Sequence, residues 1–232
     1  MSTRIVEVRA KVTKQNDLLA HALRKRFRDS GVSVVGLVSS PGSGKTAFLE
    51  KLLVGLSGDF RVAALVGDLA TENDASRLKR ATPNVRQITT GTICHLDAQM
   101  IERALEGWQL DAFDFLFIEN VGNLVCPSSY DLGEELRFVL LSATEGEDKP
   151  LKYPTIFNSS DVAIVTKMDL ADAADFDLAA ARRNIESVRP GMQIFEVSAK
   201  TGSGMQQVFQ FLREQLAHSH ETGPAFQIER TP

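Results

Sequence analysis

A loop that can bind phosphate is the strongest chemical signal in the sequence. Residues 39–46 read Ser-Ser-Pro-Gly-Ser-Gly-Lys-Thr and stand between an apolar segment and a helical one. Backbone N–H groups in such a loop surround a β-phosphate, helped by the positive end of the helix dipole. We expect Lys45 to bridge the β- and γ-phosphates and the Thr46 hydroxyl to bind Mg²⁺. The predicted phosphate-binding residues are Gly42, Ser43, Gly44, Lys45, Thr46 and Ala47.

One position of this loop departs from the usual pattern. The pattern begins with a glycine six residues before the lysine, and this chain has Ser39 there. A serine can still form the turn if its φ angle is negative, so the prediction of a phosphate site stands.

Two carboxylates follow apolar segments and are predicted to complete the magnesium site. Asp68 ends RVAALVGD, and Glu119 ends FDFLFIE. The Gly122 amide, three residues after Glu119, is placed to contact the γ-phosphate. We therefore predict Thr46, Asp68 and Glu119 as magnesium ligands. The predicted catalytic residues are Lys45, Asp68, Glu119 and Gly122, although the sequence does not identify the side chain that positions the attacking water.

Two short motifs near the end of the chain predict a guanine site. They read Thr166-Lys167-Met168-Asp169 and Ser198-Ala199-Lys200. The Asp169 carboxylate can accept hydrogen bonds from guanine N1–H and the exocyclic amine, whereas adenine N1 would leave it unpaired. The Ala199 N–H can donate to guanine O6, and the Lys167 stem can cover the base. The predicted ligand is therefore GTP or GDP.

The two cysteines of the chain, Cys94 and Cys126, are candidate metal ligands together with His95. Each cysteine follows a predicted strand, and we expect those two strands to be neighbours. Two thiolates and an imidazole suit zinc, nickel or copper better than Mg²⁺. Three ligands are one short of a closed site, so water or a second copy of the chain must supply the rest. The alternative is a pair of inert buried cysteines.

The elements that must position these residues alternate between apolar strands and helices. Because the strands are continuous apolar runs, both of their faces are expected to be buried. The predicted fold class is therefore α/β, a P-loop NTPase fold with a mostly parallel sheet flanked by helices. Strands are predicted at 33–38, 61–67, 85–90, 113–119, 161–166 and 193–199, and helices at 16–30, 45–56, 73–80, 97–108, a stretch ending near 188, and 204–216. The segment 131–141 is given no type.

Length and composition predict one large domain with extensions. We expect a helical extension over 1–31, with a capping residue at Asn16 or Asp17 and a stop at Gly31, packed on a GTPase domain over 32–216. A flexible tail is predicted over 217–232. The net charge of −4 and the pI near 5.6 argue against nucleic-acid binding. No apolar run approaches the roughly 18 residues that a membrane helix needs, and no signal sequence is recognised, so the expected location is cytoplasmic, without a membrane partner.

At this point the sequence resembles a known family. The segments VSSPGSGKT, GDLATENDA, TTGTICHLDA, FLFIENVGNLVCP, TEGEDKPLKYP and VTKMDL together resemble HypB, the GTPase family that inserts nickel during [NiFe] hydrogenase maturation. The resemblance covers residues 16–216. The related urease accessory GTPases have a different loop after the glutamate that ends the strand.

The resemblance implies more than the spacing alone. It implies the SIMIBI class of P-loop proteins, slow hydrolysis, and a homodimer that forms on GTP binding. Nickel or zinc would be held at the subunit interface by Cys94, His95 and Cys126. The implied partners are a HypA-type zinc-containing chaperone and the hydrogenase large-subunit precursor. Neither an N-terminal Cys-x-x-Cys-type motif nor a His-rich stretch is present, so we expect no separate nickel site.

The sequence thus predicts a GTP-hydrolysing metallochaperone, in which the segment 119–126 links the γ-phosphate to the metal. Alternatives remain at this stage. One is a metal-binding protein that uses nucleotide only structurally. Others are a P-loop kinase, or a metallochaperone that serves urease or cobalamin enzymes.

Overall fold

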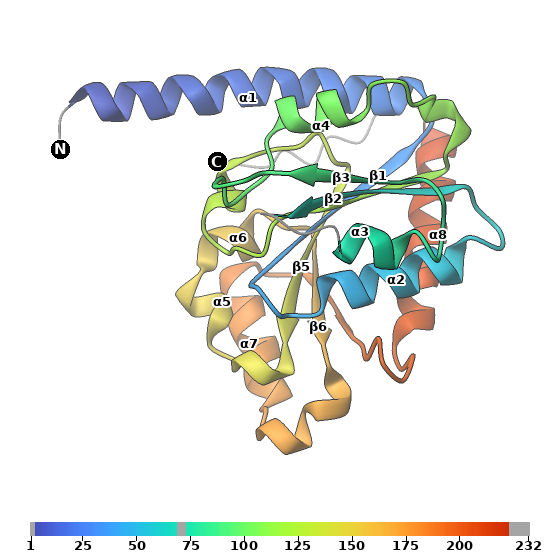
Figure 1. Ribbon diagram of the computed structural model, residues 1–232. Coiled ribbons are helices and arrows are strands. Elements are labelled where there is room, and N and C mark those ends of the chain that lie inside the picture. The colour runs from blue at the N-terminus through green and yellow to red at the C-terminus, as the bar shows by residue number, and fades with distance from the viewer. Residues whose placement is uncertain (1–2, 69–72, 223–232) are drawn as a thin grey trace.

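A seven-stranded parallel sheet forms the centre of the computed structural model, which describes residues 3–68 and 73–222 (Figure 1). The strand order is β3-β2-β4-β1-β5-β6-β7, and every neighbouring pair is parallel. The strands are β1 (Ser33–Ser39), β2 (Val62–Asp68), β3 (Val85–Thr89), β4 (Phe115–Glu119), β5 (Leu136–Ser142), β6 (Val162–Thr166) and β7 (Gln193–Glu196). The predicted α/β fold is confirmed.

Helices cover both faces of this sheet (Figure 1). The α-helices are α1 (Thr3–Asp29), α2 (Lys45–Leu56), α3 (Asn73–Leu78), α4 (Ala98–Ala104), α5 (Lys149–Lys152), α6 (Pro154–Asn158), α7 (Leu178–Val188) and α8 (Met205–Thr222). Short 3₁₀ helices are η1 (Leu110–Ala112), η2 (Cys126–Ser129), η3 (Ala143–Glu145), η4 (Met168–Leu170) and η5 (Asp172–Ala174). None of the helices in the described ranges is long and apolar enough to cross a membrane.

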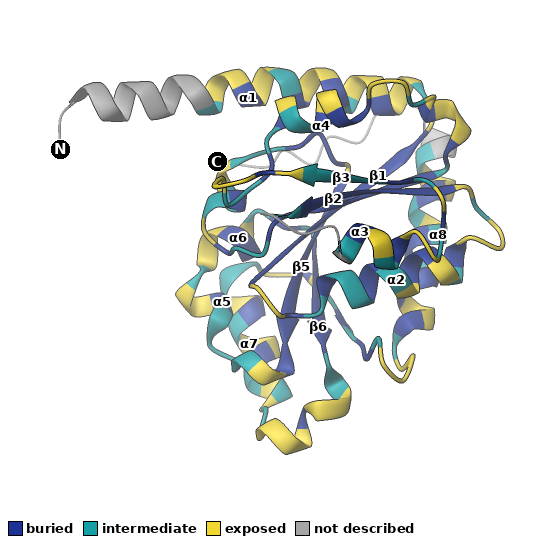
Figure 2. Ribbon diagram, viewed as in Figure 1, coloured by how far each residue is buried: buried dark blue, intermediate teal, exposed yellow. Residues whose placement is uncertain are grey.

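The five inner strands are buried on both sides, because successive side chains point to opposite faces and a core covers each face. Val35 and Leu37 of β1 belong to the core beneath α2, α3 and α8, whereas Val34 belongs to the core beneath α1 and α4. A third cluster lies beneath α6 and α7. Figure 2 shows the inner strands as buried ribbons between helices whose outer sides are exposed, whereas β3 at the edge is only partly buried. The prediction of strands buried on both faces is therefore confirmed for the five inner strands and wrong for the edge strands β3 and β7.

Helix α1 is longer than the sequence indicated, because it begins at Thr3 and ends at Asp29. Asn16 therefore lies inside the helix and does not cap it. Its buried side chain bridges two other segments: Nδ2 donates to the Asp131 carbonyl at 2.9 Å, and Oδ1 accepts from Ala98 N at 2.8 Å. Gly31 has a φ of +69° and follows the helix end, as predicted.

Strand β5 begins in the segment 131–141, to which the sequence analysis gave no type, and ends one residue beyond it, at Ser142. It sits between β1 and β6, and all of its residues are buried. Arg137 interrupts its apolar pattern. This guanidinium is buried because it pairs with Glu134, at 2.6 Å, and donates to the Tyr130 carbonyl at 2.8 Å. A buried charge that is fully paired can stand in a central strand.

The last helix also exceeds its predicted end, since α8 continues to Thr222. Residues 217–222 of the predicted flexible tail are therefore helical, because the helical pattern runs on past Leu216. The rest of that tail, 223–232, lies outside the described residues, as does 69–72 of the GDLATENDA segment. The division into an extension, a GTPase domain and a tail stays a prediction.

Candidate functional site

The predicted phosphate-binding loop, residues 39–46 (hereafter the phosphate loop), stands at the point where the order of the strands reverses. β1 lies between β4 and β5, so the loop that follows β1 emerges between the ends of its two neighbours. In open parallel sheets this crevice is the usual place for a ligand. Gly42 and Gly44 have φ angles of +75° and +94°, which glycine adopts without steric cost. Helix α2 begins directly after them, at Lys45.

Ser39, at the position of the usual glycine, is the partner of the loop lysine. The Lys45 side chain is buried, and its Nζ donates to Ser39 Oγ at 2.8 Å. Ser43 Oγ also donates to Ser39 Oγ. Burial lowers the pKa of Lys45, while the charges of Glu119, Asp74 and Glu145 act in the opposite direction. The departure from the pattern thus supplies a hydroxyl that holds the ammonium group.

Glu119 and Thr46 meet beside this lysine, as the predicted magnesium site requires. Thr46 Oγ1 donates to Glu119 Oε1 at 2.7 Å. The second oxygen, Oε2, is buried and has no hydrogen-bond partner among the described residues. Burial raises the pKa of Glu119 to about 7, although Lys45 and Thr46 lower it. An orphaned carboxylate oxygen next to a hydroxyl fits a hard cation such as Mg²⁺.

Asp68 and Gly122 flank this pair. Asp68 is the last residue of β2, next to β4, and its charge raises the pKa of Glu119. Gly122 lies directly against the phosphate loop: a Cβ on it would stand 2.9 Å from Pro41 Cα and 3.0 Å from Pro41 N. The segment after β4 therefore contacts the loop through backbone, with no room for a side chain.

The two predicted guanine motifs meet each other at the ends of β6 and β7. Ser198 Oγ donates to Asp169 Oδ1 at 2.6 Å, and Met168 N donates to the Val197 carbonyl at 3.2 Å. Ala199 and Lys200 follow in the next turn, where Lys200 is exposed. A carboxylate and a backbone N–H on adjacent turns can bind the edge of one base.

The first guanine motif is also tied to the phosphate loop. Thr166 Oγ1 donates to the Ser43 carbonyl at 2.6 Å. Lys167, with a φ of +56°, donates from Nζ to the Gly42 carbonyl at 2.7 Å. The base and phosphate motifs thus lie side by side, although more than 120 residues separate them in the chain.

One further segment, η3, contacts the phosphate loop and was missed from the sequence. The Glu145 carboxylate accepts a hydrogen bond from Ser40 Oγ. Glu145 also closes a capping box with Ser142, whose Oγ accepts from Thr144 N. The pattern Ser-x-x-Glu was a readable signal for this turn. Its contact with Ser40, 105 residues away, was not.

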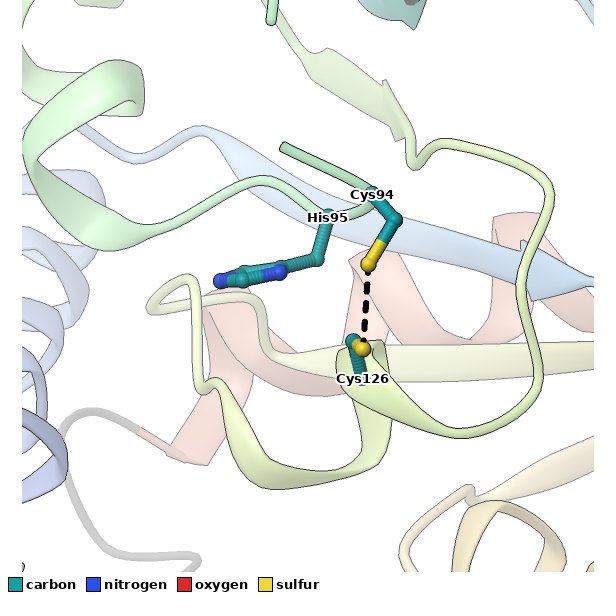
Figure 3. A group of neighbouring side chains, drawn as sticks. All are labelled: Cys94, His95 and Cys126. Atoms are coloured by element: carbon teal, nitrogen blue, oxygen red, sulfur yellow. Dashed lines mark hydrogen bonds between the residues drawn. The ribbon is translucent and has the colours of Figure 1, made fainter. Parts of the chain in front are cut away.

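The structure brings Cys94, His95 and Cys126 together (Figure 3). Their candidate ligand atoms all lie within 4.8 Å of one another. The two sulfurs point toward each other at 3.0 Å, and both cysteines are free and half-buried. The expectation that they follow neighbouring strands was wrong, because β2 lies between β3 and β4. The loops after these strands are long enough to meet across the end of β2.

His95 is held in a state that suits a ligand. Its Nδ1 is buried without a hydrogen-bond partner in the described part of the chain. The ring stacks on Tyr130, with centroids 3.9 Å apart at 29°. Burial lowers the pKa of His95, against the charge of Asp97, which favours the neutral imidazole that binds metals. Tyr130 was not recognised from the sequence, because nothing local marks a stacking partner 35 residues away.

The pKa of the Cys126 thiol depends on its neighbours. The hydrogen bond with Cys94 and burial raise its pKa, while a hydrogen bond from the Asn123 side chain lowers it. A metal ion favours the thiolate outright. Two thiols and a neutral imidazole with an unpaired nitrogen are a donor set for zinc or nickel.

Known proteins are similar to this chain over most of its length. Residues 33–196 match the CobW/HypB/UreG nucleotide-binding domain. The chain is 41% identical to the hydrogenase/urease maturation factor HypB of Helicobacter hepaticus, over 97% of this chain and 94% of that protein. The crystal structure of HypB from Helicobacter pylori in complex with nickel superimposes with a TM-score of 0.84 at 40% identity, covering 91% of this chain and 100% of that one.

A more distant structure shares the fold alone. The 54 kDa signal recognition particle protein from Aeropyrum pernix, in complex with GDP, has a TM-score of 0.55 at 18% identity. The match covers 82% of this chain and 48% of that protein.

Proposed function

Because the chain belongs to the HypB family of CobW/HypB/UreG nucleotide-binding proteins, we propose that it is a GTP-hydrolysing metallochaperone that assists nickel insertion into [NiFe] hydrogenase. Its sheet is that of the SIMIBI class of P-loop GTPases. One observation supports the proposal most directly. Cys94, His95 and Cys126 converge at the end of the same loop that begins at Glu119 of the phosphate site.

GTP binds across the phosphate loop and the two guanine motifs. The N–H groups of the loop and the Lys45 ammonium take the β- and γ-phosphates, as Lys45 leaves its contact with Ser39. Asp169 accepts from the guanine edge while Ser198 fixes the direction of its carboxylate. The arrangement selects guanine because the same carboxylate would face an acceptor on adenine.

Thr46 and Glu119, with Asp68 close by, hold Mg²⁺ in this proposal. When bound, the ion would neutralise part of the negative charge on the phosphate oxygens. Gly122 places its backbone against Pro41, where its amide can reach the γ-phosphate. Hydrolysis is slow, which suits a switch that changes state rather than a metabolic enzyme.

Nickel is the cargo of this switch, and zinc is an alternative occupant. The two thiolates and the His95 imidazole leave at least one position for water or for a second copy of the chain. Ile93 and Val125, next to the two cysteines, are exposed by 41% and 60%. Exposed apolar residues beside an incomplete metal site fit a homodimer that forms when GTP binds.

The partners are the ones that the family resemblance implies. A HypA-type zinc-containing chaperone supplies or receives nickel in the cytoplasm, and the hydrogenase large-subunit precursor takes it. Hydrolysis moves the segment 119–126 and loosens the metal site, so that nickel leaves for the precursor. Neither nucleic acid nor a membrane takes part.

A second client, urease, is suggested by the name of the Helicobacter hepaticus relative, a hydrogenase/urease maturation factor. The two clients differ in the protein that receives nickel and need no difference at the metal site. Complementation separates them. The chain should restore hydrogenase activity to a bacterium lacking its own HypB, and the Cys126→Ser and Lys45→Ala variants should not.

Restoration of urease activity in a urease-producing strain that lacks its HypB would assign the second client. Failure to restore either activity, with the protein expressed and folded, would contradict a role in nickel insertion. Restoration by Lys45→Ala would instead favour a metal-binding protein whose role does not depend on GTP.

A further inference from the structure

The loop between β4 and η2 touches the phosphate loop at one end and the metal site at the other. Gly122 lies against Pro41, as described, and Cys126 is the first residue of η2. Only three residues stand between Gly122 and Cys126. A shift of Gly122 must therefore displace the backbone close to the thiol.

Asn123, directly after Gly122, makes a contact that a simple turn does not need. Its Oδ1 accepts from Val125 N at 2.9 Å, which is an ordinary turn stabilised by an asparagine. Its Nδ2 reaches across 29 residues and donates to the Cys94 carbonyl at 3.2 Å. The same amide thus fixes the loop that bears Cys126 and the backbone of Cys94.

A neighbouring asparagine holds a different part of the same turn. Asn120 Oδ1 accepts from Leu96 N at 3.0 Å and from Val121 N at 2.9 Å. This contact anchors the turn two residues beyond Cys94, next to β4, and does not involve the residue against the phosphate loop. Of the two asparagines, Asn123 is therefore the one adjacent to Gly122 and bonded to a metal-ligating residue.

We infer that Asn123 is a positioning residue that holds Cys94 and Cys126 in one metal site and couples that site to Gly122. When Gly122 moves against the phosphate loop, Asn123 moves with it and pulls the Cys94 backbone. The distance and direction of the two thiolates then depend on the nucleotide. The inference rests on the proposed metal-carrying function.

The test compares two Asn123 variants with a matched control. Asn123→Ser keeps an acceptor for the turn but cannot reach Cys94. Asn123→Asp keeps the shape and the turn acceptor, loses the donor and adds a negative charge. Asn184→Ser is the control, because Asn184 Nδ2 makes the same kind of long-range bond, to the Glu147 carbonyl at 2.8 Å, away from the metal site.

Nickel and zinc affinities are measured by competition with a chromophoric chelator, with GDP and with a non-hydrolysable GTP analogue. Loss of a residue that orients metal ligands weakens affinity about 10- to 100-fold. We expect that loss for Asn123→Ser with the GTP analogue. For both Asn123 variants, the metal affinity with the GTP analogue and the metal affinity with GDP should become nearly equal, so that their ratio approaches one. The wavelength of the thiolate-to-nickel absorption band should also shift. Asn184→Ser should match the unaltered chain.

The ratio is decisive for Asn123→Asp, because the added carboxylate can itself attract a cation. Unaltered affinity and ratio in both variants would overturn the inference. Equal weakening in both nucleotide states, with the ratio kept, would overturn the coupling and leave only a structural contact. If the unaltered chain itself binds no metal, the proposed function fails as well. This outcome is distinguishable from failure of the inference, because it is seen in the unaltered chain, without any Asn123 variant.

Discussion

The sulfur atoms of Cys94 and Cys126 lie 3.0 Å apart, although 32 residues separate them in the chain. Their loops follow β3 and β4 and must cross the end of β2 to meet. Gly67 in β2 makes this approach possible, since a Cβ there would stand 2.8 Å from Leu96 Cγ. Leu96 fills the space and draws the Cys94 turn down onto the sheet, toward Cys126.

Replacing one of these thiols should separate metal binding from nucleotide binding. A four-ligand zinc site contributes 10–16 kcal/mol, so one ligand accounts for about 3 kcal/mol, or about 100-fold in affinity. Cys126→Ser should lose about that much nickel and zinc affinity in chelator competition. Its GTP affinity, measured by titration, should stay within about 3-fold, below 1 kcal/mol.

Lys45→Ala is the reciprocal control for this experiment. The variant should lose GTP affinity, because the Lys45 ammonium is the proposed contact for the β- and γ-phosphates. It should keep the metal, because Lys45 contacts Ser39 and not the cysteines. Equal loss of both ligands in Cys126→Ser would show that the two sites are not separate.

Asp169 should determine which base binds. In Asp169→Asn the side chain keeps one acceptor and gains a donor, which no longer matches the exocyclic amine of guanine. The new donor does match the O2 carbonyl of xanthine. We expect GTP affinity to fall by about 100-fold or more, because two hydrogen-bond donors would then face each other, and XTP to bind in its place.

Nucleotide competition with GTP, XTP and ATP measures this change. Equal affinity for GTP in Asp169→Asn and the unaltered chain would remove Asp169 from the base site. Glu102→Gln, on the exposed side of α4, changes a carboxylate to an amide elsewhere and should leave the order of affinities unchanged.

Gly122→Ala should disturb the phosphate loop through backbone overlap. The new Cβ would press on Pro41 Cα and N, which are main-chain atoms that cannot rotate away. Overpacking of this kind costs about 1–3 kcal/mol, so GTP hydrolysis should fall about 10-fold. Steady-state phosphate release measures the rate.

Gly58→Ala is the matched control, because nothing lies within 4 Å of a Cβ at that glycine. It should hydrolyse GTP like the unaltered chain. Unchanged GTP hydrolysis in Gly122→Ala would mean that the phosphate loop shifts at little energetic cost. Gly122 would then not be a rigid contact between the two sites.

Glu119 should make the stability of the apo-protein depend on pH. Its pKa rises from 4.5 in the unfolded chain to about 7 in the fold, so the folded state binds more protons between those values. Stability therefore falls as pH rises through this window, by up to about 3 kcal/mol, and is level above it. Thermal unfolding in the presence of a chelator measures the slope.

Glu119→Gln should remove this dependence, because the amide does not titrate and still accepts from Thr46. Without Mg²⁺ and nucleotide, the variant should melt higher than the unaltered chain at about pH 8 and near it at about pH 4. Glu102→Gln should keep the original slope. A slope that persists in Glu119→Gln would place the titrating group elsewhere.

The fold and the phosphate loop followed from the sequence because their signals are local. Continuous apolar runs indicated most of the strands, and the spacing of Gly42, Gly44 and Lys45 indicated the loop. β5 was missed because Arg137 breaks its apolar run, and only its distant partners, Glu134 and Tyr130, make that charge tolerable. A local sequence pattern cannot show that partners elsewhere offset the cost of burying this charge.

The candidate metal residues were found by type, but their surroundings were not. Tyr130 against His95, Asn123 against Cys94 and Asn16 against Asp131 are contacts between segments that only the fold brings together. The start of α1 was misplaced for a related reason. Asn16 is a typical capping residue, and here its side chain is used for a tertiary bridge.

The most direct test of the account is nickel and zinc binding to the purified apo-protein, with GDP and with a non-hydrolysable GTP analogue, while mass in solution is followed. The account predicts a metal site that is lost in Cys94→Ser and Cys126→Ser. It also predicts that the GTP analogue changes the affinity of this site and converts monomer to dimer. Metal binding that ignores the nucleotide, or no metal binding at all, would contradict it.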